Sequence, residues 1–255
     1  MTPARKLWIV GLGPGPAHWM TPEAVEAIAQ ASDIVGYGPY LDRLSLRPDQ
    51  SRHSSDNRVE IDRARHALRL AAQGRSVAVV SGGDPGIFAM AAAVFEAIED
   101  GEPAWRELPI EIAPGVSAIQ AAAARLGAPL GHDFCAISLS DNLKSWEVVV
   151  RRLNAAADGD FVVALYNPAS KARPRRIFEA FDLLRERKAA ATPVAFARAV
   201  GRPDEHIVLT SLGEADPGIA DMSTLVFVGS SETRFVTRGA ARPWLLTPRS
   251  YGTVR

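Results

Sequence analysis

The stretch from Val77 to Met90, which reads VAVVSGGDPGIFAM, constrains the fold more than any other part of the chain. Its four apolar residues at 77–80 predict a short strand that is buried on both faces. Three glycines and a proline at 81–86 then stop either a strand or a helix from continuing. Small and apolar residues from Ile87 to Glu99 favour a helix that packs on a sheet. This order of elements places the glycine-rich bend at the carboxyl edge of a parallel sheet, where open α/β sheets bind their ligands.

The bend itself is the first candidate site. Gly82 and Gly83 would allow a ligand to approach the backbone closely. The Asp84 carboxylate can accept hydrogen bonds from an ammonium or a hydroxyl group. A tight turn in which Asp84 only caps the following helix fits the same residues. The pattern leaves both interpretations open.

Two more bends of this kind occur in the first half of the chain. The apolar run at 7–10 predicts a strand that enters GLGPGP at 11–16. A dinucleotide-binding fingerprint would need a third glycine where this chain has Pro16, so a nicotinamide-dependent dehydrogenase is disfavoured. Ile110–Ile112 predicts a further strand, followed by APGVSA at 113–118, in which Ser117 is placed to cap a helix. Bends that follow neighbouring strands favour a shared ligand crevice.

The second half predicts a different sheet. Strand patterns recur at 134–139, 161–166, 193–200, 206–212 and 224–228. The last three have no helix-length spacer between them, which indicates a mixed sheet with antiparallel pairs. Ala128–His132 is the best candidate for a linker, so we expect α/β domains at 1–127 and 128–255. The polar residues 45–58 are predicted to form a mobile connection.

Composition excludes several classes of protein. Lysine plus arginine equals aspartate plus glutamate at 29 each, so no overall field favours nucleic acid. The only cysteine, Cys135, excludes an intrachain disulfide, and the five histidines lack metal-ligand spacing, so we expect no bound metal. Charges, proline and glycines interrupt the most apolar stretch, so no membrane span is predicted. The single cysteine and the absence of a leader pattern favour a cytoplasmic location.

Four segments in order resemble the tetrapyrrole (corrin/porphyrin) methylases: VGLGPG at 10–15, SGGDPGIF at 81–88, APGVSA at 113–118, and the strand and YNP turn at 161–168. That family implies an α/β fold of the tetrapyrrole methylase type. Its two α/β domains lie around a cleft, the N-terminal one with a mostly parallel sheet and the C-terminal one with a mixed sheet. It also implies an S-adenosylmethionine-dependent enzyme, usually a homodimer.

Three further segments resemble the branch of the family that acts in cobalamin synthesis: SLSDNLKSW at 138–146, LYNPASKAR at 165–173 and TPRSY at 247–251. Within that branch, these segments look most like the member that methylates carbon 17, whose methyl transfer accompanies ring contraction. Because the donor implied by the family is S-adenosylmethionine, the resemblance also implies S-adenosylhomocysteine as a product. A methylase acting at another tetrapyrrole carbon, or a non-catalytic tetrapyrrole-binding protein, stays open as an alternative.

The resemblance also implies roles for individual residues. The cofactor-binding residues would be Pro14, Gly82, Gly83, Asp84, Ile87, Ser117, Ala118, Tyr166, Ala199 and Thr224. The substrate-binding residues would be Gly11, Gly13, Ser140, Asp141, Asn167, Lys171 and Arg173. Cationic side chains suit a substrate with many carboxylates, although solvated surface charge is the alternative for each of them. No catalytic residue is identified; Asp84, Asp141 and His132 are candidates for a general acid or base.

Overall fold

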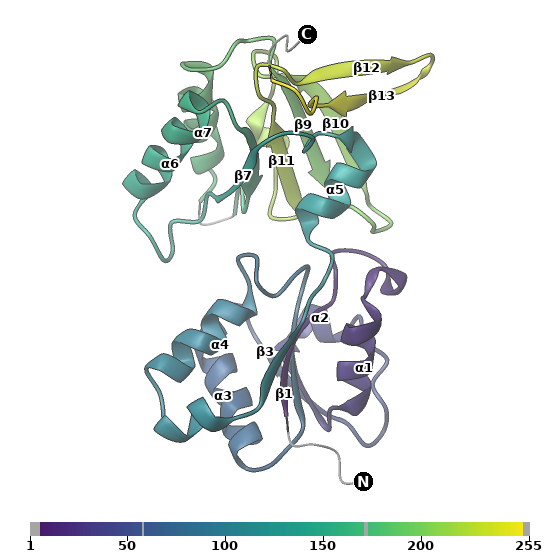
Figure 1. Cartoon of the computed structure of the whole chain (residues 1–255), viewed down its shortest axis with the longest axis vertical. Coiled ribbons are helices and arrows are strands. Elements are labelled where there is room, and N and C mark those ends of the chain that lie inside the picture. Colours follow the sequence, from purple (N-terminus) through teal and green to yellow (C-terminus); the bar gives the residue numbers. More distant parts are fainter. Residues whose placement is uncertain (1–5, 58, 171–172, 252–255) are drawn as a thin grey trace. The chain divides into compact units, whose positions relative to one another are not determined.

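The computed structural model describes residues 6–57, 59–170 and 173–251. The chain divides into two compact units, Met1–Ala118 and Ile119–Arg255, and each has its own five-stranded sheet (Figure 1). The division falls at the start of helix α5 (Ala118–Leu126), whereas we expected it at the end of this helix. The helix is tied to the second unit because the Ile119 N–H donates to the Tyr166 hydroxyl.

The first sheet is parallel and has the strand order β3-β2-β4-β1-β5. Its strands are β1 (Leu7–Gly11), β2 (Asp33–Tyr37), β3 (Ser51–Ser55), β4 (Val77–Ser81) and β5 (Ile110–Ala113). The helices of this unit are α1 (Pro22–Gln30), α2 (Gly38–Leu41), α3 (Glu60–Ala72) and α4 (Met90–Glu99), with 3-10 turns η1 (Ala17–Trp19) and η2 (Pro103–Glu107). The mostly parallel N-terminal sheet that the sequence predicted is confirmed.

Helices cover both faces of the central strands, which explains their continuous apolar sequence. Leu7 and Val77 pack with buried residues of α3 and α4 on one face. Trp8 and Ala78 pack with buried alanines of α1 and with Leu41 on the other. Side chains that alternate along one strand therefore enter two separate cores.

Two local predictions for this unit were wrong. The polar segment 45–58 contains β3, an edge strand whose partly exposed SRHSS sequence carries no hydrophobic signal. It is held by parallel pairing with β2 and by the hydrogen bond that joins His53 Nε2 and the buried Asp33 carboxylate, 2.9 Å apart. Helix α4 begins at Met90 rather than at Ile87, because Phe88 adopts a left-handed conformation with φ of 53°.

The second sheet is mixed, as expected, with the order β10-β9-β11-β8-β7. Strands β7 and β8 are parallel, while β11 is antiparallel to β8 and β9, and β10 is antiparallel to β9. The strands are β7 (Phe134–Ser138), β8 (Val162–Tyr166), β9 (Pro193–Arg198), β10 (His206–Ser211) and β11 (Thr224–Val228). Helices α6 (Trp146–Asp158) and α7 (Arg176–Arg185) pack on it, and η3 (Pro217–Ile219) precedes β11.

A small additional sheet was missed by sequence reasoning. The hairpin β12 (Arg234–Arg238) and β13 (Ala241–Leu246) pairs with the short strand β6 (Gly127–Ala128) in the order β12-β13-β6. The predicted linker at 128–132 thus begins within a strand. The hairpin extends from the second unit in Figure 1. Its residues are mostly exposed, so its pattern lacks the buried face by which we recognised the other strands.

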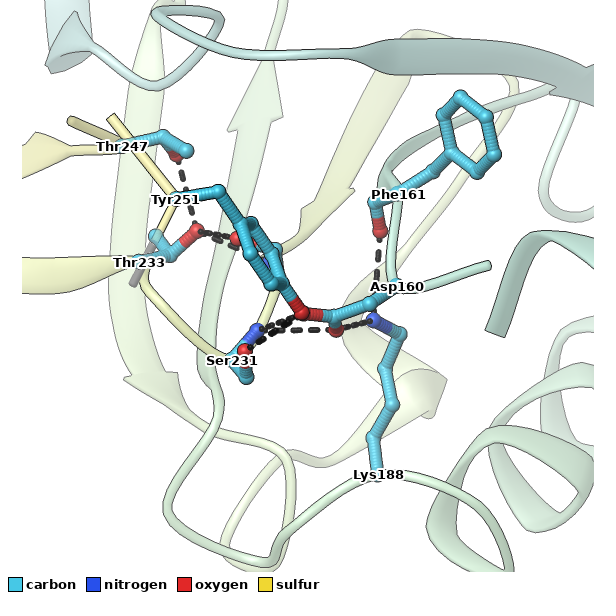
Figure 2. Close-up of polar contacts among 8 residues, drawn as sticks. Asp160, Phe161, Lys188, Ser231, Thr233, Thr247 and Tyr251 are labelled. Atoms are coloured by element: carbon cyan, nitrogen blue, oxygen red, sulfur yellow. Dashed lines mark hydrogen bonds and ion pairs between the residues drawn. The ribbon is translucent and has the colours of Figure 1, made fainter. Parts of the chain in front are cut away.

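The TPRSY segment at 247–251 is fastened by side chains at both of its ends. Thr247 donates to the Pro129 carbonyl at 2.7 Å, and the Tyr251 hydroxyl donates to the Asp160 carboxylate at 2.6 Å. Figure 2 shows that Lys188 and Ser231 reach the same carboxylate. Burial alone would raise the pKa of Asp160, but hydrogen bonds from Ser231, Tyr251 and Lys188 outweigh it and lower this pKa. This network attaches the C-terminal segment to the edge of the sheet where β8 begins.

Across the described parts of the chain, no helix is long and apolar enough to cross a membrane. Those same parts hold no cluster of three or more histidine, cysteine, aspartate or glutamate side chains able to bind a metal ion.

Candidate active site

Three bends of the first unit pack backbone against backbone at the carboxyl edge of its sheet. They follow β1, β4 and β5, and β1 lies between the other two strands. Gly13 and Gly83 exchange two backbone hydrogen bonds of 3.1 Å, which join the first two bends. A Cβ on Gly115 would lie 2.3 Å from the Gly83 carbonyl oxygen, and a Cβ on Gly11 would lie 2.6 Å from the Gly115 nitrogen. Only glycine permits this approach at positions 11 and 115.

Asp84 ties two of these bends together. One carboxylate oxygen accepts from the Gly86 N–H at 2.8 Å, and the other accepts from the Gly115 N–H at 3.0 Å. The carboxylate therefore caps its own turn and also holds the bend that follows β5. In this structure it acts on the backbone of the site, and direct binding of a ligand stays a prediction.

The bend after β4 presents an accessible backbone face. Gly83 has a φ of 72°, and a Cβ placed on it would meet no atom closer than the Ser117 Cα at 4.0 Å. Ile87 and Phe88, which follow this bend, are 37% and 54% exposed despite being apolar. An open backbone face beside exposed apolar side chains fits a ligand that has both polar and apolar parts, such as a nucleoside.

The other residues assigned to the first unit lie in the same bends. Pro14 stands between Gly13 and Gly15 in the bend after β1. Ser117 is 1% exposed and directly precedes α5, whose first residue is Ala118. The structure thus brings together the residues that the resemblance assigned to this unit.

In the second unit, Tyr166, Ala199 and Thr224 share one edge of the sheet. Tyr166 ends β8, Ala199 follows β9, and Thr224 begins the antiparallel strand β11 that lies between them. Ala199 is 4% exposed and has a φ of 50°, a conformation that is unfavourable for alanine. The Thr224 hydroxyl donates to Asp221 at 2.8 Å and accepts from the Asp221 N–H at 3.1 Å, so it fixes the turn before β11.

The segments expected to bind the substrate meet at the same edge of this sheet. Ser138 Oγ, at the end of β7, accepts from the Asn167 side chain at 2.9 Å and from the Ser140 N–H at 3.3 Å. Arg173 donates to the Leu139 carbonyl at 3.2 Å, which joins the two segments again. Lys171, which was also assigned to the substrate, lies outside the described residues.

Asp141 is an acidic residue that lies among cationic side chains in this region. Its oxygens lie 2.8 Å from Arg176 Nε and 3.6 Å from Arg173 Nε. Burial alone would raise the pKa of Asp141, but the hydrogen bond and charge of Arg176, with the charge of Arg173, lower it. Burial, together with the charges of Arg152 and Arg173, lowers the pKa of nearby Lys144. A cluster with more cations than acids is suited to an anionic ligand.

His132 is separated from this region. It precedes β7, whereas Asp141 follows the other end of the same strand. The centroid of the His132 ring lies 5.6 Å from that of the Tyr251 ring. The structure thus does not bring His132 to the edge of the sheet that carries Asp141 and Tyr166.

Sequence reasoning missed Tyr40 and Arg43, and it gave Gly115 no role of its own. The Tyr40 ring packs against Gly82, since a Cβ on Gly82 would lie 2.7 Å from the ring carbon Cζ. Arg43 donates to the carbonyl oxygens of the bend after β1. Nothing local in YLDR at 40–43 distinguishes these side chains from surface residues, whereas a glycine after Ala113-Pro114 was a usable signal for Gly115.

Comparison with known proteins identifies the family. Residues 6–216 match the model of the tetrapyrrole (corrin/porphyrin) methylases. The chain belongs to this family. The methylase is 60% identical over 245 residues to a precorrin-3B C(17)-methyltransferase of Sinorhizobium sp, covering 96% of each chain.

Two solved structures match the fold along most of the chain. The crystal structure of the methyltransferase CobJ matches with a TM-score of 0.90 and 50% identity, covering 95% of this chain and 99% of that chain. A uroporphyrin-III C-methyltransferase from Thermus thermophilus, complexed with S-adenyl homocysteine, matches with a TM-score of 0.65 and 20% identity. It covers 88% of this chain and 92% of that one, and at this identity it shows the fold alone.

Proposed function

We propose that this methylase transfers a methyl group from S-adenosylmethionine to carbon 17 of precorrin-3B, with ring contraction to precorrin-4, in cobalamin biosynthesis. The observation that carries the proposal is the 60% identity with the Sinorhizobium enzyme along nearly the full length of both chains. The packed bends of the first unit and the cationic edge of the second sheet support it, because they suit a nucleoside donor and a carboxylate-rich acceptor.

The donor is assigned to the bends after β1, β4 and β5. S-adenosylmethionine supplies an electrophilic methyl group on its sulfonium, so the protein has mainly to align and desolvate the reactants. The open backbone face of Gly83, with the adjacent Gly82 and the apolar side chain of Ile87, would contact the adenosyl part, while Asp84 keeps the loops in place. Pro14, Ser117, Ala118, Tyr166, Ala199 and Thr224 complete the assigned donor contacts.

The tetrapyrrole is assigned to the polar segments. Arg173 and Lys171 would pair with its carboxylates, and Ser140, Asp141 and Asn167 would offer hydrogen bonds. Gly11 and Gly13 would present backbone to the macrocycle. Asp141 also sets the positions of two guanidinium groups, so its role in this proposal is to orient cations toward the substrate.

An anaerobic incubation with methyl-labelled S-adenosylmethionine and precorrin-3B tests the function, read by mass spectrometry and carbon NMR. We expect one labelled methyl group at carbon 17 and a new acetyl group from ring contraction. A labelled product from uroporphyrinogen-III or precorrin-4 alone would assign another tetrapyrrole carbon. If the protein binds these three tetrapyrroles but transfers a methyl group to none of them, a non-catalytic tetrapyrrole carrier would be favoured.

The remaining expectations concern assembly and location. We propose a cytoplasmic homodimer that binds neither nucleic acid nor membrane, in keeping with the formal net charge of zero. Sedimentation equilibrium of the purified protein would give the mass of the assembly, and a monomer at all concentrations would contradict the dimer. Fractionation of producing cells would test the location.

A further inference from the structure

One arginine holds the bend that follows β1. The Arg43 guanidinium donates to the carbonyl oxygens of Leu12 at 2.9 Å, Gly13 at 3.0 Å and Gly15 at 2.8 Å. Two of these bonds come from Nη2 and one from Nη1, so the planar fork reaches three carbonyl oxygens within four residues of the loop. Carbonyl oxygens that converge in this way need hydrogen-bond donors, and the fixed donor geometry of arginine satisfies several of them together.

The short segment that contains Arg43, residues 40–43, also contacts the bend that follows β4. Arg43 follows α2, and the Tyr40 ring of that helix packs against Gly82 in the bend after β4. The two bends are themselves joined by the backbone bonds between Gly13 and Gly83. Residues 40–43 therefore support both bends from one side, while the Gly13–Gly83 pair joins them directly.

We infer that Arg43 is a positioning residue for methyl transfer, which fixes the carbonyls at 12–15 so that the bends after β1 and β4 keep one relative geometry. This inference rests on the proposed function and extends it to a residue outside the motifs. Without the guanidinium, these carbonyls lose their cationic partner, while the backbone bonds between Gly13 and Gly83 remain. A displacement of the order of 1 Å at an aligned site lowers transfer by roughly 100-fold.

A lysine would not replace this residue. Its ammonium is a compact charge on a flexible stem and lacks the planar fork that meets the carbonyl oxygens of Leu12, Gly13 and Gly15 together. A cavity of about 240 Å³, lined by Leu12, Gly15, Pro16, Ala17, Met20, Arg43 and Leu44, lies beside the guanidinium. A free guanidinium ion added to a truncated variant can therefore reach the same carbonyls.

The experiment compares R43K and R43A with the wild type and with the control R65A, which removes an exposed arginine 3.9 Å from Asp62 on α3. We expect kcat to fall roughly 10- to 100-fold in both Arg43 variants, with a smaller change in the KM for the tetrapyrrole. Affinity for S-adenosylhomocysteine, measured by calorimetry, should weaken several-fold only, because the Asp84–Gly115 tie remains. Millimolar guanidinium should restore R43A, whereas methylammonium should not, and R65A should respond to neither.

The inference would be overturned if R43K kept the wild-type kcat. It would also be overturned if guanidinium failed to restore the activity of an R43A variant whose melting temperature stays near that of the wild type. If R43A loses both its activity and its melting temperature, the R43K variant provides the test. A folded R43K with a lowered kcat supports the positioning role, and a folded R43K with the wild-type kcat refutes it. Wild-type protein that transfers no methyl group to any tetrapyrrole refutes the proposed function instead. Calorimetric recovery of S-adenosylhomocysteine affinity in R43A by guanidinium then still tests how Arg43 supports the bend.

Discussion

Removal of the Asp84 carboxylate tests whether this residue organises the site or contacts the ligand. In Asp84→Ala, the Gly86 and Gly115 N–H groups lose their acceptor. In Asp84→Asn, the side chain keeps one acceptor oxygen but turns an NH₂ group toward the other N–H, so one of the two bonds is lost. Both variants should therefore loosen the bend after β5 from the bend after β4.

The expected magnitude comes from these two bonds. The bond to Gly86 is exposed and contributes about 0.5 to 1 kcal/mol, whereas the partly buried, charge-assisted bond to Gly115 contributes about 1.5 kcal/mol. The alanine variant should thus lose roughly 2 kcal/mol of free energy of unfolding. At about 2.1 cal/mol/K of unfolding entropy per residue, this is about 8 °C in the melting temperature of the unit Met1–Ala118. If the donor binds only the organised loops, its dissociation constant rises by up to roughly 30-fold, the limit at which the whole 2 kcal/mol is lost from the population of organised loops.

The assay combines calorimetry with S-adenosylhomocysteine, thermal unfolding, and exchange of the Gly115 amide hydrogen followed by NMR. Asp100→Ala, at an exposed residue after α4, is the matched control and should leave the three quantities unchanged. In Asp84→Ala, all three should move together. Lost affinity with an unchanged melting temperature and unchanged exchange would refute our reasoning, because it would show that Asp84 contacts the ligand and does not hold the loops.

Three further predictions follow from the packing and the charges. Gly115→Ala should abolish donor binding, since its Cβ would overlap the Gly83 carbonyl; Gly38→Ala, where the nearest atom is a hydroxyl oxygen at 3.2 Å, should bind normally in the same calorimetric titration. The pKa of Asp160 is lower in the folded state than its unfolded value of 3.8, so its ionised carboxylate stabilises the fold at pH values above 3.8. This stabilisation is lost as the pH falls through the lower, folded pKa. Urea titrations of Asp160→Asn should therefore show a free energy of unfolding that depends less on acid pH than that of the wild type. Burial raises the pKa of Cys135 to about 11, so a disulfide reagent at pH 8 should modify the native protein far more slowly than the unfolded one, and equal rates would contradict the burial.

Local patterns predicted most of the elements around the site. Thr21-Pro22-Glu23, a hydroxyl followed by proline and an acid, is a local start signal for a helix, and α1 begins there with the Thr21 hydroxyl accepting from the Ala24 N–H at 3.1 Å. Apolar runs of four or five residues became the buried strands β1, β4 and β8. These features depend on neighbours in the sequence, so a single chain suffices to read them.

Elements whose stability is nonlocal were predicted poorly. β3 is polar and exposed, and it is a strand because β2 offers it an edge. The β12–β13 hairpin is likewise mostly exposed on both faces. A period-2 pattern appears only where one face is buried, so neither segment carries the signal.

The sequence by itself determined that glycine-rich bends follow buried strands, because glycine and proline cannot continue a strand and a parallel sheet places such bends at one edge. Only the tertiary structure decided how the bends are held. Asp84 binds a backbone N–H that is 31 residues away, and Arg43 reaches carbonyls 28 to 31 residues away. These contacts exist because β1 lies between β4 and β5 and because Leu41 of α2 packs in the same core as Trp8 of β1, and no local spacing encodes that arrangement.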